Sequence, residues 1–155
     1  MVRKVFLGLV ILLALIQFFR PQKNENSEII TLDDISRSYT IPDTVHNILV
    51  KKCYDCHSNH TNYPWYFNLQ PIAWWLNDHI REGKAELNFS EFSNYPERKA
   101  IHKLEEIGEV IHDGTMPLRS YTLLHPDAVI TDEEREAINA WLATFNIVVK
   151  TQNKP

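Results

Sequence analysis

The chain has 155 residues and a formal net charge of −4, enough for one domain with a single core once an apolar N-terminal stretch is set aside. Glycine is scarce and apolar side chains are spread along most of the length, which excludes extended disorder. No run of lysine or arginine indicates a nucleic-acid surface, so we expect no nucleic-acid partner.

Residues 1–20 form an apolar run with basic flanks. Arg3 and Lys4 precede the run and Arg20 closes it, a pattern typical of membrane targeting. A helix of about 15 residues is roughly 22 Å long, short of a hydrocarbon core of about 30 Å, but flanking charges can snorkel. The bulky residues that follow do not fit a cleavage site, so we expect an uncleaved transmembrane signal anchor, with a cleaved signal peptide as the alternative.

The rest of the chain divides into three parts. Residues 21–41 are rich in polar side chains and are expected to form a tether, with Ile29, Ile30, Leu32 and Ile35 at most on the domain surface. The folded domain is expected over residues 42–146. Residues 147–155 read as a polar tail.

The domain begins with a predicted helix. Asp43 is expected to cap it after Pro42, and Val45, Ile48 and Leu49 have helical spacing. This helix would lead directly into Cys53, the first residue of the next motif.

That motif reads C-x-x-C-H, the c-type haem attachment pattern, and it spans Cys53 to His57. Each thiol, Cys53 and Cys56, can add across a haem vinyl group, and His57 is then held under the iron as the proximal ligand. Three other interpretations of the cysteine pair are possible. A thioredoxin-like redox pair would need a βαβ context, a structural zinc site would need a second pair of ligands, and a simple disulfide needs only an oxidising compartment.

The middle of the chain is predicted to be helical. The aromatic cluster at residues 63–67 is expected to pack as core over the haem edge. Pro71 suits the start and Gly83 the end of a second helix, after which residues 84–95 should fold over the core. A third helix is expected between Pro96 and Asp113.

Met116 precedes a proline in the loop after the third helix, and it is the only internal methionine. A thioether there can lie opposite the proximal histidine, and soft sulphur suits haem iron. A core-filling methionine is the alternative. The competing distal ligands are His60, His79, His102, His112 and His125.

The last predicted helix starts at a capping box formed by Thr131 and Glu134. Its apolar face carries Ile138, Trp141 and Leu142. The expected fold is therefore all-α.

This order of helices and motifs resembles class I c-type cytochromes, and more closely the membrane-anchored haem-binding domain family of Bacteroidetes-type bacteria. The match covers about residues 42–143, with these shared motifs: Cys53 to Asn59, Tyr63-Pro64-Trp65-Tyr66, Trp74-Trp75, Glu86 to Ser90, Met116-Pro117-Leu118, Tyr121-Thr122 and His125-Pro126.

The resemblance implies a class I cytochrome c-like helical domain wrapped around one covalent haem c. It also implies one-electron transfer. We expect the protein to be attached to the bacterial inner membrane with its haem domain in the periplasm, and to have redox proteins as partners. A soluble periplasmic form would follow from signal cleavage. A haem-based sensor or small-ligand module is the alternative function. An enzyme is not expected, because a peroxidase would need a distal acid/base pair and usually a second haem.

Overall fold

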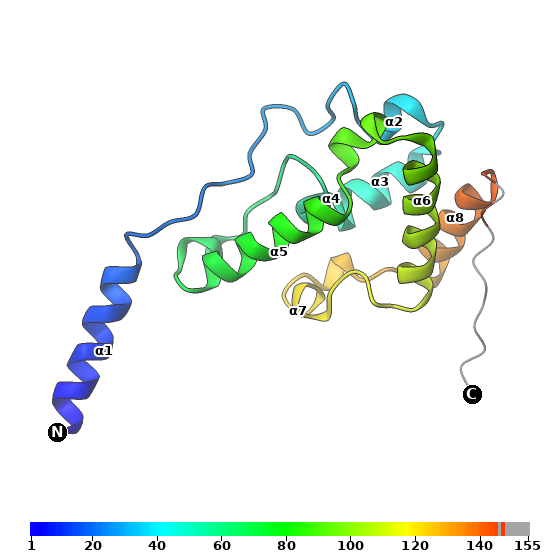
Figure 1. Cartoon of the computed structure of the whole chain (residues 1–155). Helices are drawn as coiled ribbons and strands as arrows, with labels where there is room; N and C mark the ends of the chain where they lie inside the picture. Colours follow the sequence, from blue (N-terminus) through cyan, green and yellow to red (C-terminus); the bar gives the residue numbers. More distant parts are fainter. Residues whose placement is uncertain (146, 148–155) are drawn as a thin grey trace.

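The computed structural model describes residues 1–145 and 147, and within them it is all-α, as predicted (Figure 1). An isolated bridge pairs Glu25 with His60. The α-helices are α1 Val2–Ile16, α2 Ile35–Ser38, α3 Asp43–Lys52, α4 Tyr54–His57, α5 Ile72–Glu86, α6 Glu97–His112, α7 Arg119–Thr122 and α8 Asp132–Ala143. Three short 3-10 helices are η1 Trp65–Asn68, η2 Phe89–Asn94 and η3 Pro126–Ala128.

Helix α1 projects away from the body of the molecule (Figure 1). None of the helices in the described part of the chain is both long and apolar enough to cross a membrane. The predicted transmembrane helix is therefore not found. The regular helix covers 15 residues and ends before Gln17, whose side chain is hydrogen-bonded to the backbone of Gln70 in the body.

Parts of the predicted tether, residues 21–41, pack into the domain. Asp34 and Ile35 are fully buried, and the Tyr54 hydroxyl donates a hydrogen bond of 2.9 Å to the Asp34 carboxylate. Further back, the Asn24 backbone N–H donates to the Tyr63 hydroxyl at 2.6 Å. Polar composition suggested a solvated linker, but here the polar groups are satisfied by partners within the fold.

The core lies where α8 packs against α3 and α6. Leu49, Leu104, Ile138 and Leu142 are fully buried there, which confirms the periodicity expected of these helices. Of the predicted polar tail, Ile147 is the one described residue, and it is buried in this core; the others lie outside the described residues.

The capping box at the start of α8 is present. Glu134 also accepts a hydrogen bond of 2.5 Å from the buried ammonium of Lys52, and that ammonium donates a second one to the Val129 carbonyl. The last residue of α3 is thus fixed to the first turn of α8. This contact sets the position of the C-x-x-C-H motif, which begins at the next residue.

Helix α5 does not end at Gly83 as predicted but continues to Glu86. A Cβ at Gly83 would lie 2.8 Å from the Cys56 carbonyl oxygen, so the glycine allows α5 to pass against α4. A second, smaller core lies beside this crossing and includes Phe67, Leu76 and Ile80. The aromatic cluster is divided, because Phe67 is buried whereas Trp65 is 76 % exposed.

Candidate functional site

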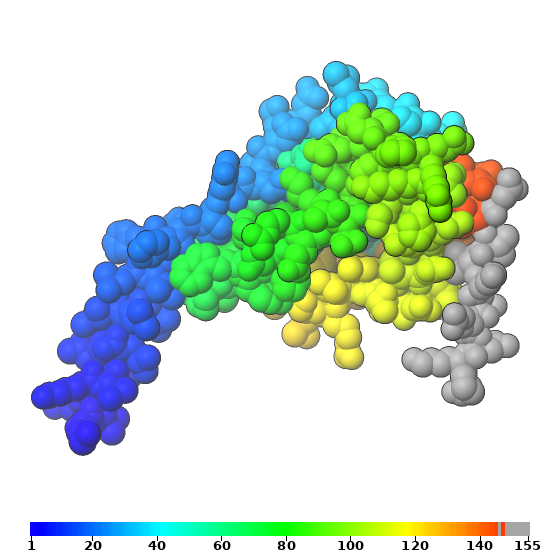
Figure 2. All heavy atoms as spheres, in the orientation of Figure 1, coloured from blue at the N-terminus to red at the C-terminus, as the bar shows by residue number. Residues whose placement is uncertain are grey.

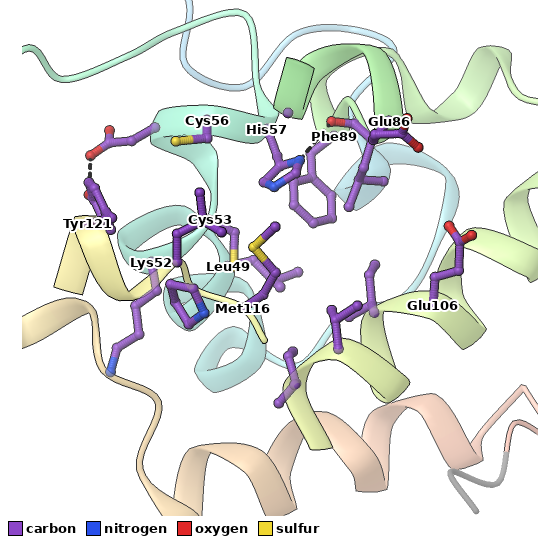
Figure 3. Close-up of a pocket in the computed structure, with 18 of the residues that line it drawn as sticks. Leu49, Lys52, Cys53, Cys56, His57, Glu86, Phe89, Glu106, Met116 and Tyr121 are labelled. Carbon is purple, nitrogen blue, oxygen red and sulfur yellow. Dashed lines mark hydrogen bonds between the residues drawn. The ribbon is translucent and has the colours of Figure 1, made fainter. Parts of the chain in front are cut away.

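One cavity brings together all four predicted site residues. It is lined by Cys53, Cys56, His57 and Met116, together with side chains of α5 and α6 (Figure 3). Its volume is about 680 Å³, within the range of roughly 300–1,000 Å³ typical of small-molecule and cofactor sites. Apolar groups dominate the wall, among them Leu49, Leu87, Phe89, Ile107, Val110, Ile111, Leu118 and Ile130.

His57 is held in one tautomer by the backbone. Its Nδ1 lies 3.1 Å from the Leu87 carbonyl oxygen, and because a carbonyl can only accept, Nδ1 must carry the proton. Burial lowers the pKa of His57, opposed by hydrogen bonds to the carbonyls of Leu87 and Gly83. The neutral ring therefore keeps the lone pair of Nε2, the form in which histidine binds a metal.

The two cysteines are free thiols at the junction of α3 and α4 and within α4. Burial, together with the neighbouring Cys56, raises the pKa of Cys53 to about 12, against the effect of Lys52. Burial and Asp55 raise the pKa of Cys56 to about 11. Redox-active cysteine pairs have a lowered thiol pKa, so the raised values here argue against a thioredoxin-like redox pair. The described residues also contain no group of three or more His, Cys, Asp or Glu side chains that could hold a metal ion, which gives no support to a zinc site.

Met116 is positioned by a tight turn at the end of α6. Gly114 has a φ of 66°, in the left-handed region that favours glycine. The backbone N–H groups of Thr115 and Met116 then donate to the Val110 carbonyl at 3.0 and 3.3 Å. The chain folds back across the end of α6 in this way, and the Met116 side chain lies in the same cavity as His57 (Figure 3).

A hydrogen bond joins the motif to the methionine side of the cavity. The Tyr121 hydroxyl donates to the Asp55 carboxylate at 2.7 Å, and the same carboxylate accepts from the Asn62 backbone N–H at 3.0 Å. Sequence reasoning missed this contact, because 66 residues separate Asp55 from Tyr121 and neither residue carries a pairing signal. It ties α4 to α7, directly after the loop that holds Met116.

The model of the haem-binding domain family matches residues 11–144. The chain belongs to the haem-binding domain family. Haem is therefore the cofactor of this protein. Comparisons with curated proteins and with solved structures gave no match.

The cavity fits haem in its chemistry. Its wall is mainly apolar, as a porphyrin face requires, and it presents a neutral imidazole, a thioether and two thiols from His57, Met116, Cys53 and Cys56. These are the donor types that proteins use to hold haem iron and to attach haem covalently. Their individual roles remain predictions.

The structure separates the competing distal histidines. Of the five, His79 lines the haem cavity and the other four do not. His125 Nε2 lies 2.7 Å from the Tyr66 hydroxyl, His60 Nδ1 lies 2.8 Å from the Asn26 carbonyl oxygen, and His102 faces carboxylates on the surface of α6. Met116 and His79 are therefore the two distal candidates that the fold brings to the haem cavity.

Charged side chains from α5 and α6 also line the haem cavity. Lys103 lies between two carboxylates, with Nζ 2.6 Å from Glu106 and 3.6 Å from Glu86, and the hydrogen bond to Glu106 is the main cause that raises the pKa of Lys103. Glu82 and Glu109 add two more carboxylates to the lining. The charged part of this lining is thus predominantly acidic.

Proposed function

We propose that the protein carries single electrons on a covalently bound haem c, held by thioethers to Cys53 and Cys56 and ligated by His57 and Met116. The observation that carries this proposal is the convergence of these four side chains on one apolar cavity. They come from α4, from the residue that precedes it, and from a loop more than fifty residues later in the chain. The motif alone would place only three of them together.

The free state of both cysteines supports covalent attachment. Each thiol would add its Sγ to one carbon of a vinyl group and its hydrogen to the other, so that no atom is lost and no oxidant is needed. Attachment of this type is made outside the cytosol in bacteria with c-type cytochromes. We therefore infer that the domain works on the periplasmic side of the inner membrane.

The axial ligands would set the redox properties. His57 would bind through Nε2 while the Leu87 carbonyl holds the opposite edge of its ring. Met116 would supply a soft sulphur, which raises the potential relative to a second histidine. Bound haem would supply the one-electron chemistry, and the apolar wall would keep water and its high dielectric constant away from the metal. We assign no catalytic residue. We expect redox proteins as partners, with basic surfaces that complement the acidic side chains lining the cavity.

The decisive test is Met116→Leu, with His79→Gln as the matched variant at the other distal candidate. We expect Met116→Leu to lower the midpoint potential and to remove the methionine-ligand signature from the absorption spectrum, whereas His79→Gln changes neither. The opposite pattern would make His79 the distal ligand. Intact mass and a haem stain after denaturing electrophoresis check the attachment, and free or disulfide-bonded cysteines in the mature protein would refute it.

A sensor of small gaseous ligands is the second candidate. The observation that favours it is that Met116 lies on a loop and not within a helix, so that a gas could displace its sulphur without breaking a helix. Carbon monoxide added to the reduced protein separates the two functions. Poor binding supports the electron carrier, and rapid, tight binding supports the sensor.

A further inference from the structure

Helix α1 has an apolar surface that the described part of the protein does not cover. It contains no buried residue, and large apolar side chains such as Phe6, Leu9 and Leu12 are more than half exposed. The helix projects from the body in the space-filling view (Figure 2). A helix that is apolar on all sides is stable in water only when another apolar phase covers it.

Three exposed tryptophans lie in the two elements that flank Gln70, whose backbone contacts the base of this helix. Trp65 is in η1, and Trp74 and Trp75 are in the first turn of α5; they are 76 %, 37 % and 47 % exposed. Trp141, by contrast, is buried in the core. Tryptophan combines a large apolar ring with a polar N–H, and it is enriched where hydrocarbon meets water.

Hydrogen bonds fix α1 to this part of the body. The Gln17 side chain accepts from the Gln70 backbone N–H at 3.0 Å and donates to the Gln70 carbonyl at 3.2 Å. The Trp74 indole donates to the Phe19 carbonyl at 2.7 Å. The exposed rings of Phe18 and Phe19 therefore continue the apolar surface from α1 to the tryptophans.

The charge of the N-terminal segment suits anionic lipid. The first 22 residues carry three basic side chains, Arg3, Lys4 and Arg20, and no acidic one, although the whole chain has a net charge of −4. Basic side chains beside an apolar helix strengthen binding to anionic phospholipid.

We propose that α1 and the tryptophan face, defined as Trp65, Trp74 and Trp75, bind together to the surface of an anionic phospholipid bilayer. The N-terminal segment is then retained in the mature protein, and the domain lies against the lipid instead of moving freely on a tether. Helix α5 runs from Trp74 and Trp75 to Gly83 at the haem cavity, about 12–14 Å along its axis at roughly 1.5 Å per residue. The cofactor is thereby held close to the lipid surface. The inference does not depend on how haem is attached.

The test uses the full-length haem-loaded protein and vesicles of phosphatidylcholine mixed with phosphatidylglycerol. Two matched vesicle preparations differ only in whether the acyl chains carry bromine, which quenches tryptophan emission at close range. We expect the protein to float with both preparations and to lose tryptophan emission only with brominated lipid. Quenching by haem is the same in both and cancels in the comparison.

Variants assign the quenching to the proposed surface. Trp65→Phe combined with Trp75→Phe should abolish most of the bromine-dependent loss, whereas Leu32→Ser, at an 84 % exposed leucine just before α2, should leave it unchanged. Flotation without bromine-dependent quenching would show that α1 binds alone and would refute the tryptophan face. A mature chain that begins after residue 20, or a full-length protein that does not float, would overturn the proposal altogether.

Discussion

Replacing Gly83 with alanine tests the close crossing of α5 and α4 behind the haem motif. The new Cβ would lie 2.8 Å from the Cys56 carbonyl oxygen and 3.3 Å from the Cys56 Cβ. Because the nearest atom belongs to the backbone, one helix must move by a few tenths of an ångström. Overpacking of this kind costs about 1–3 kcal/mol.

Helix propensity works in the opposite direction. Alanine is favoured over glycine inside a helix by about 1 kcal/mol, so the steric cost is partly offset and we expect a net loss of about 1 kcal/mol in the free energy of unfolding. The displaced Cys56 should also reduce the yield of covalently bound haem. If the crossing were looser, propensity alone would raise the stability by about 1 kcal/mol.

Urea unfolding of the two proteins, followed by circular dichroism, measures this difference, and a denaturing gel with a haem stain measures attachment. Ala85→Gly is the matched control, because Ala85 is exposed on the same helix and reports propensity without the crossing. We expect it to lower stability by at most about 1 kcal/mol and to leave haem attachment intact. A Gly83→Ala variant that is more stable than the wild type, with normal haem content, would refute the reasoning.

Two further contacts give predictions of known sign. Tyr121→Phe removes a hydrogen bond to the Asp55 carboxylate and should lower the free energy of unfolding, measured in urea, by about 1.5–3 kcal/mol. It should also loosen the Met116 loop, which would be seen as faster carbon monoxide binding to the reduced protein. Unchanged values in both assays would contradict the role given to the contact. Glu134→Gln leaves the Lys52 ammonium buried without its carboxylate and should cost about 1–3 kcal/mol at neutral pH, below the usual figure for a buried pair because Glu134 is partly exposed. Burial raises the pKa of Glu134, but the hydrogen bonds and charge of Lys52 and the Thr131 backbone outweigh it and leave the pKa lowered. The stability that this carboxylate contributes is therefore present above its unfolded pKa of about 4.3 and is lost as the pH falls through its folded pKa. The unfolding free energies of the variant and the wild type should therefore converge in acid. A constant difference between them across that pH range would contradict the assignment.

The elements that the sequence predicted correctly are those whose cause is local. The apolar spacing of α3, α6 and α8 and the capping box at Thr131 follow from residues within a few positions of one another. Gly83 shows where this reasoning stops. A glycine near the end of an apolar stripe looks like a terminator, but here it is required by the Cys56 backbone, whose position no local pattern gives.

The prediction that residues 21–41 form a tether was incomplete for a related reason. Its polar composition is typical of a linker, yet Asp34 is buried because Tyr54 supplies a hydrogen bond from the motif itself. Ile35 follows it into the core. A buried carboxylate with a dedicated partner cannot be distinguished from a solvated one until the partner is placed beside it.

The same distinction decides how the C-x-x-C-H motif is interpreted. Two cysteines and a histidine at this spacing are compatible with several chemistries, and what separates them is supplied from outside the motif. The Leu87 carbonyl fixes the tautomer of His57, burial keeps both thiols protonated, and the turn at Gly114 brings Met116 to the same cavity. A redox pair would need lowered thiol pKa values and would have no use for the methionine, whereas the c-type haem site that we propose would use His57 and Met116 as its iron ligands.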